Sequence, residues 1–242
     1  MLGASRCRRI SGVLLAMLTA SLLIRSGQLQ VSVRVIGEVT AVQGRDVTLT
    51  CNVETKEDVS QLTWQKKMDP NNENLLTYRA GREPTYLTPF AQDRIRILGK
   101  GTFDVGDILI RDVRLSDEGT YVCGFSTHPS GIQEREIKLQ VHVPPTVSIY
   151  LPPIPVQVLP RNVAECTAAA AKPPAFITWV CSSLPYNVNT TDIVHQNKTV
   201  TRTSRLWMIP TRSLSGQNAT CLVLPTRGGP TGGELHLGQY SV

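Results

Sequence analysis

The stretch that decides the fold is Asp117-Glu118-Gly119-Thr120-Tyr121-Val122-Cys123, in which an acidic residue, a glycine, a tyrosine and a cysteine occupy every second position. Another cysteine, Cys51, lies 72 positions upstream, and Trp64 follows Cys51 by 13 positions. Around both cysteines, apolar and polar residues alternate with a period of two, which is typical of half-buried β-strands. The pattern therefore places both cysteines on strands.

The Asp-x-Gly-x-Tyr-x-Cys run resembles strand F of an immunoglobulin domain. In that fold the tyrosine forms a corner with the upstream backbone, and the cysteine bridges to the facing sheet beside a buried tryptophan. The resemblance implies a Cys51–Cys123 disulfide packed against Trp64. It also implies an ion pair between Arg94 and Asp117. The span of 72 residues fits a variable-type domain.

The C-terminal half repeats the pattern, because Trp179 follows Cys166 by 13 positions and Cys221 follows Cys166 by 55. The shorter span between these cysteines is typical of a constant-type domain, and the resemblance implies a Cys166–Cys221 disulfide. We therefore predict an all-β fold of two tandem immunoglobulin-like β-sandwiches. The variable-type domain covers 28–143 and the constant-type domain 144–242.

Alternation also predicts the individual strands and their inward faces. Leu62 and Trp64 face the core, whereas Thr63 and Gln65 face the opposite side. No segment has the period of a helix. The predicted strands cover 31–35, 47–51, 62–67, 75–78 and 137–143 in the first domain, and 146–150, 203–209 and 218–223 in the second.

Three local features concern the joint and the second domain. The prolines of Val143-Pro144-Pro145 bend little and cannot continue a strand ladder, so we expect a short, stiff joint. The run Ala168 to Ala171 breaks the strand alternation. Cys181 shares the inward face of Trp179 and is either a buried free thiol or a bridge to another molecule.

The N-terminus carries arginines followed by an apolar run from Ile10 to Ile24. This pattern predicts a signal peptide over 1–27, with cleavage near Gly27. Its loss removes four arginines and lowers the formal charge from +6 to +2, so the basic composition does not indicate nucleic-acid binding. Secretion leads to an oxidising compartment, in which both predicted disulfides persist.

The rest of the sequence contains no apolar run of about 18 residues, the length that suggests a membrane span. We therefore expect an extracellular protein. It is held at the cell surface if the coding region continues past Val242 into an apolar span, and it is secreted otherwise.

N-glycosylation sequons begin at Asn189, Asn197 and Asn218. All three lie in the second domain, and the first domain has none. A first domain without attached sugars, carried on a glycosylated second domain, suggests that the first domain contacts the partner.

The chain resembles the nectins and the poliovirus receptor over nearly its whole mature length. In the second domain the resemblance rests on Lys172-Pro173-Pro174-Ala175-Phe176-Ile177-Thr178-Trp179, with 206–210 and 216–221 in support. In the first domain, Val59-Ser60-Gln61 matches the family's Val-Ser/Thr-Gln motif. Thr127-His128-Pro129 stands where the family has Thr, an aromatic residue and Pro in the loop between strands F and G.

The resemblance implies docking of front sheet on front sheet, with the aromatic of the F–G loop entering a pocket lined by an Ala-x6-Gly segment of the partner. Here His128 replaces the aromatic, and the corresponding segment, Leu76 to Glu83, lacks the Ala and the Gly at its ends. The expected partner-binding residues are Val59, Ser60, Gln61, Leu76, Tyr78, Thr127, His128 and Pro129.

The composition of the front sheet supports an interface there, with Tyr78 and His128 as amphipathic anchors. The alternative is that Thr127-His128-Pro129 is merely a proline-stiffened loop and Tyr78 a partly buried strand residue. If a partner buries His128, protonation of its ring should weaken binding. The expected flat, mostly small and polar surface comprises Thr63, Gln65, Val122, Gly124, Ser126 and Lys138.

Signatures of catalysis and metal binding are not found in the sequence. The four histidines have no Cys or His neighbour at metal-ligand spacing. There is no Gly-x-Ser-x-Gly elbow and no phosphate-binding loop. We therefore expect no enzymatic activity, no cofactor or metal, and no nucleic-acid or small-molecule substrate.

The sequence thus predicts recognition between cells through the front sheet of the variable-type domain. The expected partners are nectin-family or lymphocyte immunoglobulin receptors, bound heterophilically rather than homophilically, and a homodimer through the same domain is a further arrangement. The alternative is a secreted decoy that occupies these receptors without linking cells.

Overall fold

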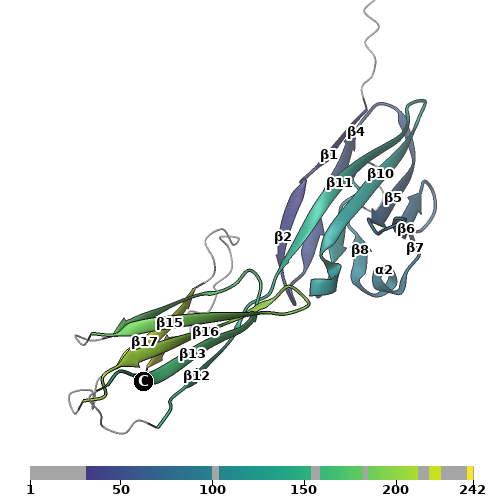
Figure 1. The fold of residues 1–242 in the computed structure, drawn as a ribbon. Coiled ribbons are helices and arrows are strands. Elements are labelled where there is room, and N and C mark those ends of the chain that lie inside the picture. Colours follow the sequence, from purple (N-terminus) through teal and green to yellow (C-terminus); the bar gives the residue numbers. More distant parts are fainter. Residues whose placement is uncertain are drawn as a thin grey trace, which may run out of the picture.

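The computed structural model describes residues 31–99, 104–153, 159–181, 185–211, 218–224 and 239–241. Figure 1 shows two β-sandwiches, the first coloured purple to teal and the second teal to yellow. They follow one another along the chain, so the prediction of an all-β fold with two tandem sandwiches is confirmed. The predicted signal peptide lies outside the described residues.

The first domain combines a six-stranded front sheet, ordered β2-β11-β10-β5-β6-β7, with two smaller sheets, β1-β4 and β3-β9-β8. In the front sheet β2 runs parallel to β11, and the other neighbours are antiparallel. The edge strands β6 and β7 are the additions that distinguish a variable-type sandwich. The strand bounds are β1 Ser32–Val35, β2 Glu38–Val42, β3 Val47–Leu49, β4 Cys51–Glu54, β5 Asp58–Lys66, β6 Glu73–Arg79, β7 Thr85–Tyr86, β8 Ile95–Ile97, β9 Ile108–Ile110, β10 Gly119–His128 and β11 Gly131–His142.

A short helix, α2 Pro89–Arg94, lies between β7 and β8 and was not expected from the sequence. Thr88 caps its start, because its side chain accepts a hydrogen bond from the N–H of Ala91 at 3.1 Å. Pro89 follows in the first turn, where its missing N–H is harmless. A helix this short shows no hydrophobic period, so the Thr-Pro start is its main sequence signal.

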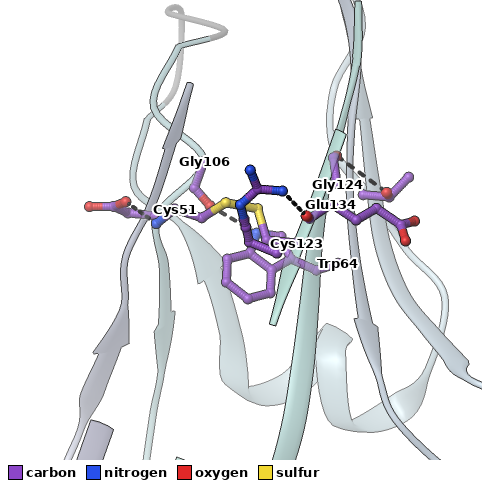
Figure 2. Close-up of a disulfide and its surroundings, with 9 residues drawn as sticks. Cys51, Trp64, Gly106, Cys123, Gly124 and Glu134 are labelled. Atoms are coloured by element: carbon purple, nitrogen blue, oxygen red, sulfur yellow. Dashed lines mark hydrogen bonds between the residues drawn. A yellow bond between two sulfur atoms is a disulfide. The ribbon is translucent and has the colours of Figure 1, made fainter. Parts of the chain in front are cut away.

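The core of the first domain is built around the Cys51–Cys123 disulfide, which joins β4 to β10 (Figure 2). Trp64 is fully buried and donates its indole N–H to the carbonyl of Gly106 at 2.8 Å. Gly106 has no room for a side chain, because an added Cβ would lie 2.9 Å from Leu62 Cδ1. The predicted disulfide and the burial of Leu62 and Trp64 are confirmed.

An ion pair links the end of α2 to the turn before β10. The guanidinium of Arg94 donates to both carboxylate oxygens of Asp117, each at 2.7 Å, and the two side chains are 15% and 5% exposed. The backbone carbonyl of Asp117 accepts a hydrogen bond from the Tyr121 hydroxyl at 2.7 Å. Burial raises the pKa of Tyr121 far above its ordinary value, so the hydroxyl stays protonated as a donor. The expected ion pair and tyrosine corner are both present.

The second domain packs a four-stranded sheet, β12-β13-β16-β15, against a three-stranded sheet, β14-β17-β18. This distribution of strands is that of a constant-type sandwich. The Cys166–Cys221 disulfide joins β13 to β17, and the indole N–H of the buried Trp179 donates to Ser204 Oγ at 3.0 Å. The strand bounds are β12 Thr146–Tyr150, β13 Arg161–Ala171, β14 Phe176–Cys181, β15 Asn187–Val194, β16 Val200–Met208, β17 Ala219–Leu224 and β18 Gln239–Ser241.

A β-bulge explains the broken alternation at the end of β13. The register between β13 and β16 shifts between Ala168 and Ala171, and Ala170 has a φ of 54°. The N–H of Ala170, displaced from the ladder, donates to Thr201 Oγ1 at 3.0 Å. The strand therefore continues through the alanine run with one extra residue relative to β16.

Cys181 is half-buried against the core of the second domain, as its position two residues after Trp179 predicts. Burial raises the pKa of its thiol, which keeps the thiol protonated and weakly nucleophilic at neutral pH. Within the described residues it forms no disulfide.

The joint between the domains is a direct contact of the two chain segments. The N–H of Val143 donates to the carbonyl of Lys172 at 2.7 Å, and the N–H of Lys172 donates back at 3.0 Å. The Lys172 ammonium donates to Glu118 Oε1 at 2.6 Å, and the other carboxylate oxygen accepts from the N–H of Val141 at 3.0 Å. Burial acts to raise the pKa of Glu118, but these hydrogen bonds and the lysine charge outweigh it, so the pKa is lowered.

Replacing Arg94 with methionine should lower the free energy of unfolding of the first domain by about 3 kcal/mol, because the buried Asp117 carboxylate loses its counter-charge. Lys138→Met is the control, since Lys138 and Glu38 are both more than half exposed and their pair should contribute less than about 1 kcal/mol. Urea unfolding followed by tryptophan fluorescence measures both losses. Equal losses would contradict the role assigned to Arg94.

Replacing Glu118 with glutamine should widen the distribution of angles between the domains at neutral pH while both domains stay folded. Since the folded-state pKa of Glu118 is lowered, its contribution is present above the ordinary glutamate pKa of about 4.3 and is lost as pH falls through the lower folded value. Acidification of the wild type should therefore reproduce the widening.

Pulsed electron spin resonance between one spin label in each domain measures this distribution. Glu54→Gln, which breaks an exposed pair with Arg34 on β1, is the control and should change nothing. An unchanged distribution in Glu118→Gln would mean that the Val143 to Lys172 bridge alone holds the joint.

Candidate protein-binding face

The front sheet of the first domain turns a polar face away from the core. The ion pairs Lys67–Glu136, at 2.6 Å, and Lys138–Glu38, at 3.1 Å, lie exposed on it. The face is therefore more charged than the small, polar surface expected from the sequence. Its outward positions are Gln61, Thr63 and Gln65 on β5, Thr77 and Arg79 on β6, Gly124 and Ser126 on β10, and Glu134, Glu136 and Lys138 on β11.

Gly124 lies on this face beside Glu134 of the neighbouring strand β11 (Figure 2). On its other side it pairs with Thr63 of β5. An added Cβ would lie 3.0 Å from Thr63 Oγ1 and 3.1 Å from Glu134 Cγ, so the two neighbouring side chains close over the glycine. Val122 was expected on the surface but is only 5% exposed, because longer side chains flank it on β5 and β11.

Two of the expected partner-binding residues face the core instead. Leu76 is fully buried and Tyr78 is 8% exposed, and both belong to the apolar cluster of the first domain. The reason is the period of two along β6, which directs Thr77 and Arg79 outward and their neighbours inward. Both expected partner-binding residues therefore lie beneath the surface that a partner would meet, and the alternative for Tyr78, a partly buried strand residue, is the one that its burial favours.

A β-bulge at the start of β5 separates the residues of the Val59-Ser60-Gln61 motif. Thr127 pairs with Val59 and Ser126 pairs with Gln61, which leaves Ser60 as the extra residue. Val59 packs against the core, whereas Ser60 is exposed and donates its hydroxyl to the carbonyl of Ser126 at 3.1 Å. Ser60 and Gln61 thus remain at the surface.

The expected F–G loop residues divide in the same way. Thr127 is only 6% exposed and donates its hydroxyl to the carbonyl of Gly131 at 3.1 Å, so it shapes the turn. His128 and Pro129 are exposed at the tip of the turn between β10 and β11. They are the part of the loop that a partner can reach.

A clamp from the turn before β5 holds this loop. The Glu57 carboxylate accepts hydrogen bonds from the Ser130 hydroxyl at 2.6 Å and from the Ser130 N–H at 3.1 Å. The Ser130 hydroxyl bond is the main cause of a lowered pKa for Glu57, and the charge of His128 contributes in the same direction. The exposed tip is therefore tied down while Glu57 is ionised.

A shallow hollow lies beside the loop end of the sheet, on the hairpin between β6 and β7. It encloses about 200 Å³ and is lined by Thr77, Arg79, Arg82, Glu83, Thr85 and Leu87. Gly81 makes the turn within this hairpin with a φ of 70°, in a left-handed conformation that favours glycine. The Leu76 to Glu83 segment thus presents its arginines, and not Leu76, to the surface.

Surface residues at the loop end of the front sheet form a row across three neighbouring strands. Ser126, Gln61 and Arg79 pair across β10, β5 and β6, and Arg79 Nε donates to Gln61 Oε1 at 2.8 Å. With His128 at one end and Arg82 at the other, we call these five residues the binding edge. Arg79 and Arg82 were not among the partner-binding residues expected from the sequence. The Arg79-Ala80-Gly81-Arg82 stretch could have indicated them, because glycine marks a turn between two strands and residues beside a turn reach the surface.

The three sequon asparagines are exposed in the second domain: Asn189 on β15, Asn197 in the turn before β16, and Asn218 just before β17. Among the described residues, no cluster of three His, Cys, Asp or Glu side chains suits a metal ion. The same part of the chain contains no helix that is both long and apolar enough to cross a membrane.

Comparison with known families matches residues 35–142 to the immunoglobulin V-set domain and residues 148–227 to the CD80-like C2-set immunoglobulin domain. Nectin-4 of Xenopus tropicalis is 31% identical over 188 residues, which cover 76% of this chain and 35% of that protein. Nectin-2 of Mus musculus is 32% identical over 214 residues, covering 84% and 39% respectively. The OX-2 membrane glycoprotein of Pongo abelii is 27% identical over 177 residues, covering 73% and 63%.

The chain thus spans well under half the length of the nectins it matches. Both matched domain types agree with the strand order of the two sandwiches, six strands in the front sheet of the first and a four-plus-three arrangement in the second. The chain is a nectin-like member of the immunoglobulin superfamily, with a V-set domain followed by a C2-set domain.

Proposed function

We propose that this protein is a cell-surface recognition protein whose V-set domain binds an immunoglobulin-superfamily receptor on an opposing cell. Nectins and an OX-2 membrane glycoprotein among its relatives support a cell-surface role. The expected partners are nectin-family or lymphocyte receptors. A secreted decoy that occupies the same receptors is the alternative, and surface staining of cells that express the complete coding region distinguishes the two.

The observation that carries this proposal is the binding edge itself. It combines an exposed ring, His128, on a clamped loop with a hollow lined by arginines on the adjacent strands. A loop held in place before binding loses less conformational entropy when a partner docks. The first domain, which carries this edge, contains no N-glycosylation sequon.

The charge of the edge favours a heterophilic partner. In a homophilic arrangement, the His128 loop of one copy would meet the hollow of the other, where Arg79 and Arg82 outnumber the single Glu83. Like charges at an interface disfavour such pairing, most strongly when the histidine is protonated. A receptor with acidic or amide groups opposite the hollow complements it better.

Alanine at His128 or at Arg79 should weaken receptor binding by about tenfold to a hundredfold, as expected for ring and arginine anchors near an interface centre. Arg34→Ala is the matched control, because Arg34 is an exposed arginine on β1, outside the front sheet. Surface plasmon resonance of residues 28–242 against a panel of nectin-family and lymphocyte receptor ectodomains measures the affinities. Equal affinities for all three variants would move the site away from the binding edge.

A pH series in the same assay tests whether the partner buries His128. A histidine ring gains its proton in the mildly acidic range, whereas the lowered pKa of Glu57 keeps the loop clamp ionised there. Affinity should therefore fall between pH 7.5 and 5.5 in the wild type and stay constant in His128→Ala. A wild-type affinity that stays the same between pH 7.5 and 5.5 would argue against burial of the ring.

Glu57→Gln should loosen the F–G loop without unfolding the domain, because the charged acceptor of both Ser130 hydrogen bonds is lost. Hydrogen exchange at the Ser130 amide should accelerate several-fold, and receptor affinity should fall through a slower association. Glu54→Gln, in the neighbouring strand β4, is the control. Unchanged exchange at Ser130 would show that the clamp does not order the loop.

A further inference from the structure

The outer face of strands β14 and β17 in the second domain is apolar. Ile177, Trp179 and Cys181 pack toward the core, so the alternate residues of β14 point outward. Phe176 is 56% exposed and Val180 is 55% exposed. Across the ladder, Phe176 pairs with Leu224, Thr178 with Leu222, and Val180 with Thr220.

The opposite sheet of the same domain is polar on the outer side of its central strands β13 and β16. The outward pairs between these two strands are polar, with Thr167 and Thr203 joined by a hydroxyl hydrogen bond at 3.1 Å and Arg205 joined to Glu165 at 3.1 Å. Exposed apolar side chains on this sheet, such as Tyr150 and Ile193, belong to its edge strands β12 and β15. On the β14–β17 face the paired side chains are mainly apolar. Exposed apolar patches of this kind are usually covered by something in the working molecule.

A sequon stands at one end of the apolar face. Asn218 is exposed and directly precedes β17, and the threonine of its sequon, Thr220, pairs with Val180. Residues two apart on extended chain share a face, so Asn218 lies on the side of Thr220 and Leu222. At about 3.4 Å per residue, Val180 lies about 7 Å along the strands from Asn218, and Phe176 about 14 Å further.

We propose that an N-linked glycan on Asn218 lies along the outer face of β14 and β17 and covers Val180, Leu222 and Phe176. Each sugar ring has a face of C–H groups that packs on aliphatic side chains and on the Phe176 ring, while its hydroxyls remain in water. The attachment point directs the glycan along the strands, so the face is covered without a partner protein. The second domain then presents sugar where it would otherwise present apolar surface.

The other two sequons are not followed by a strand whose outer face is mainly apolar. Asn189 pairs with Arg205 on the outward face of the polar sheet. Asn197 sits in a turn, where its side-chain oxygen accepts hydrogen bonds from the N–H and the hydroxyl of Thr199. Asn189→Gln is therefore the matched control for loss of the Asn218 glycan.

The experiment compares residues 28–242 secreted from a glycosylating host as wild type, Asn218→Gln and Asn189→Gln. Binding of an apolar-surface dye, 1-anilinonaphthalene-8-sulfonate, should rise several-fold in Asn218→Gln alone, together with self-association in sedimentation velocity. Adding Phe176→Ser and Val180→Thr to Asn218→Gln should return dye binding to the wild-type level. These two positions are exposed, so the core is unchanged.

A second measurement avoids any dependence on folding of the variant. Enzymatic removal of glycans from folded wild type and from Asn218→Gln should raise dye binding only in the former. The proposal is overturned if peptide mass spectrometry finds Asn218 unmodified, or if loss of the Asn218 and Asn189 glycans changes dye binding equally.

Discussion

The Cys51–Cys123 disulfide is the constraint on which the first domain depends, because it fixes β4 and β10 on opposite sides of one core. Closing a loop of 72 residues is worth roughly 4 kcal/mol in the chain-entropy account. Its larger consequence is geometric. Once Cys123 points inward, the period of two along β10 also turns Tyr121 and Phe125 inward and leaves Gly124 and Ser126 on the outer face.

The stretch from Asp117 to Cys123 performs three separate tasks within seven residues. Asp117 receives Arg94 and provides the carbonyl for the Tyr121 corner. Glu118, its neighbour, reaches the second domain through Lys172. Cys123 ties the sheets together. The same seven-residue stretch therefore contributes to the core of the first domain and to the joint between the domains. A substitution in it can alter the stability of the first domain and the contact with the second.

The two sandwiches present different kinds of surface, one charged and one partly apolar. The first presents a charged front sheet that ends in a clamped loop and an arginine-lined hollow. The second presents exposed sequon asparagines, and one of its faces carries apolar side chains along β17, the strand that Asn218 precedes, and its neighbour β14. In the arrangement we propose, recognition is confined to the V-set domain, and sugars shield the C2-set domain that carries it.

The resemblance of both Cys-Trp-Cys patterns to immunoglobulin domains was sufficient to predict the disulfides, the buried tryptophans, the Arg94–Asp117 pair and the two sandwich types, because each belongs to a motif that marks which distant strands meet. Alternation added which residues of most strands face the core. The bulges at Ser60 and Ala170 and helix α2 were not predictable in this way. Nor was the extra residue Leu75 on β6, which sets the phase in which Leu76 and Tyr78 face inward. A bulge shifts the inward face by one residue, and only the pairing partner across the ladder reveals where it occurs. The sequence by itself thus determined which strands meet, whereas tertiary pairing decided which side chains of those strands reach the surface and form the binding edge.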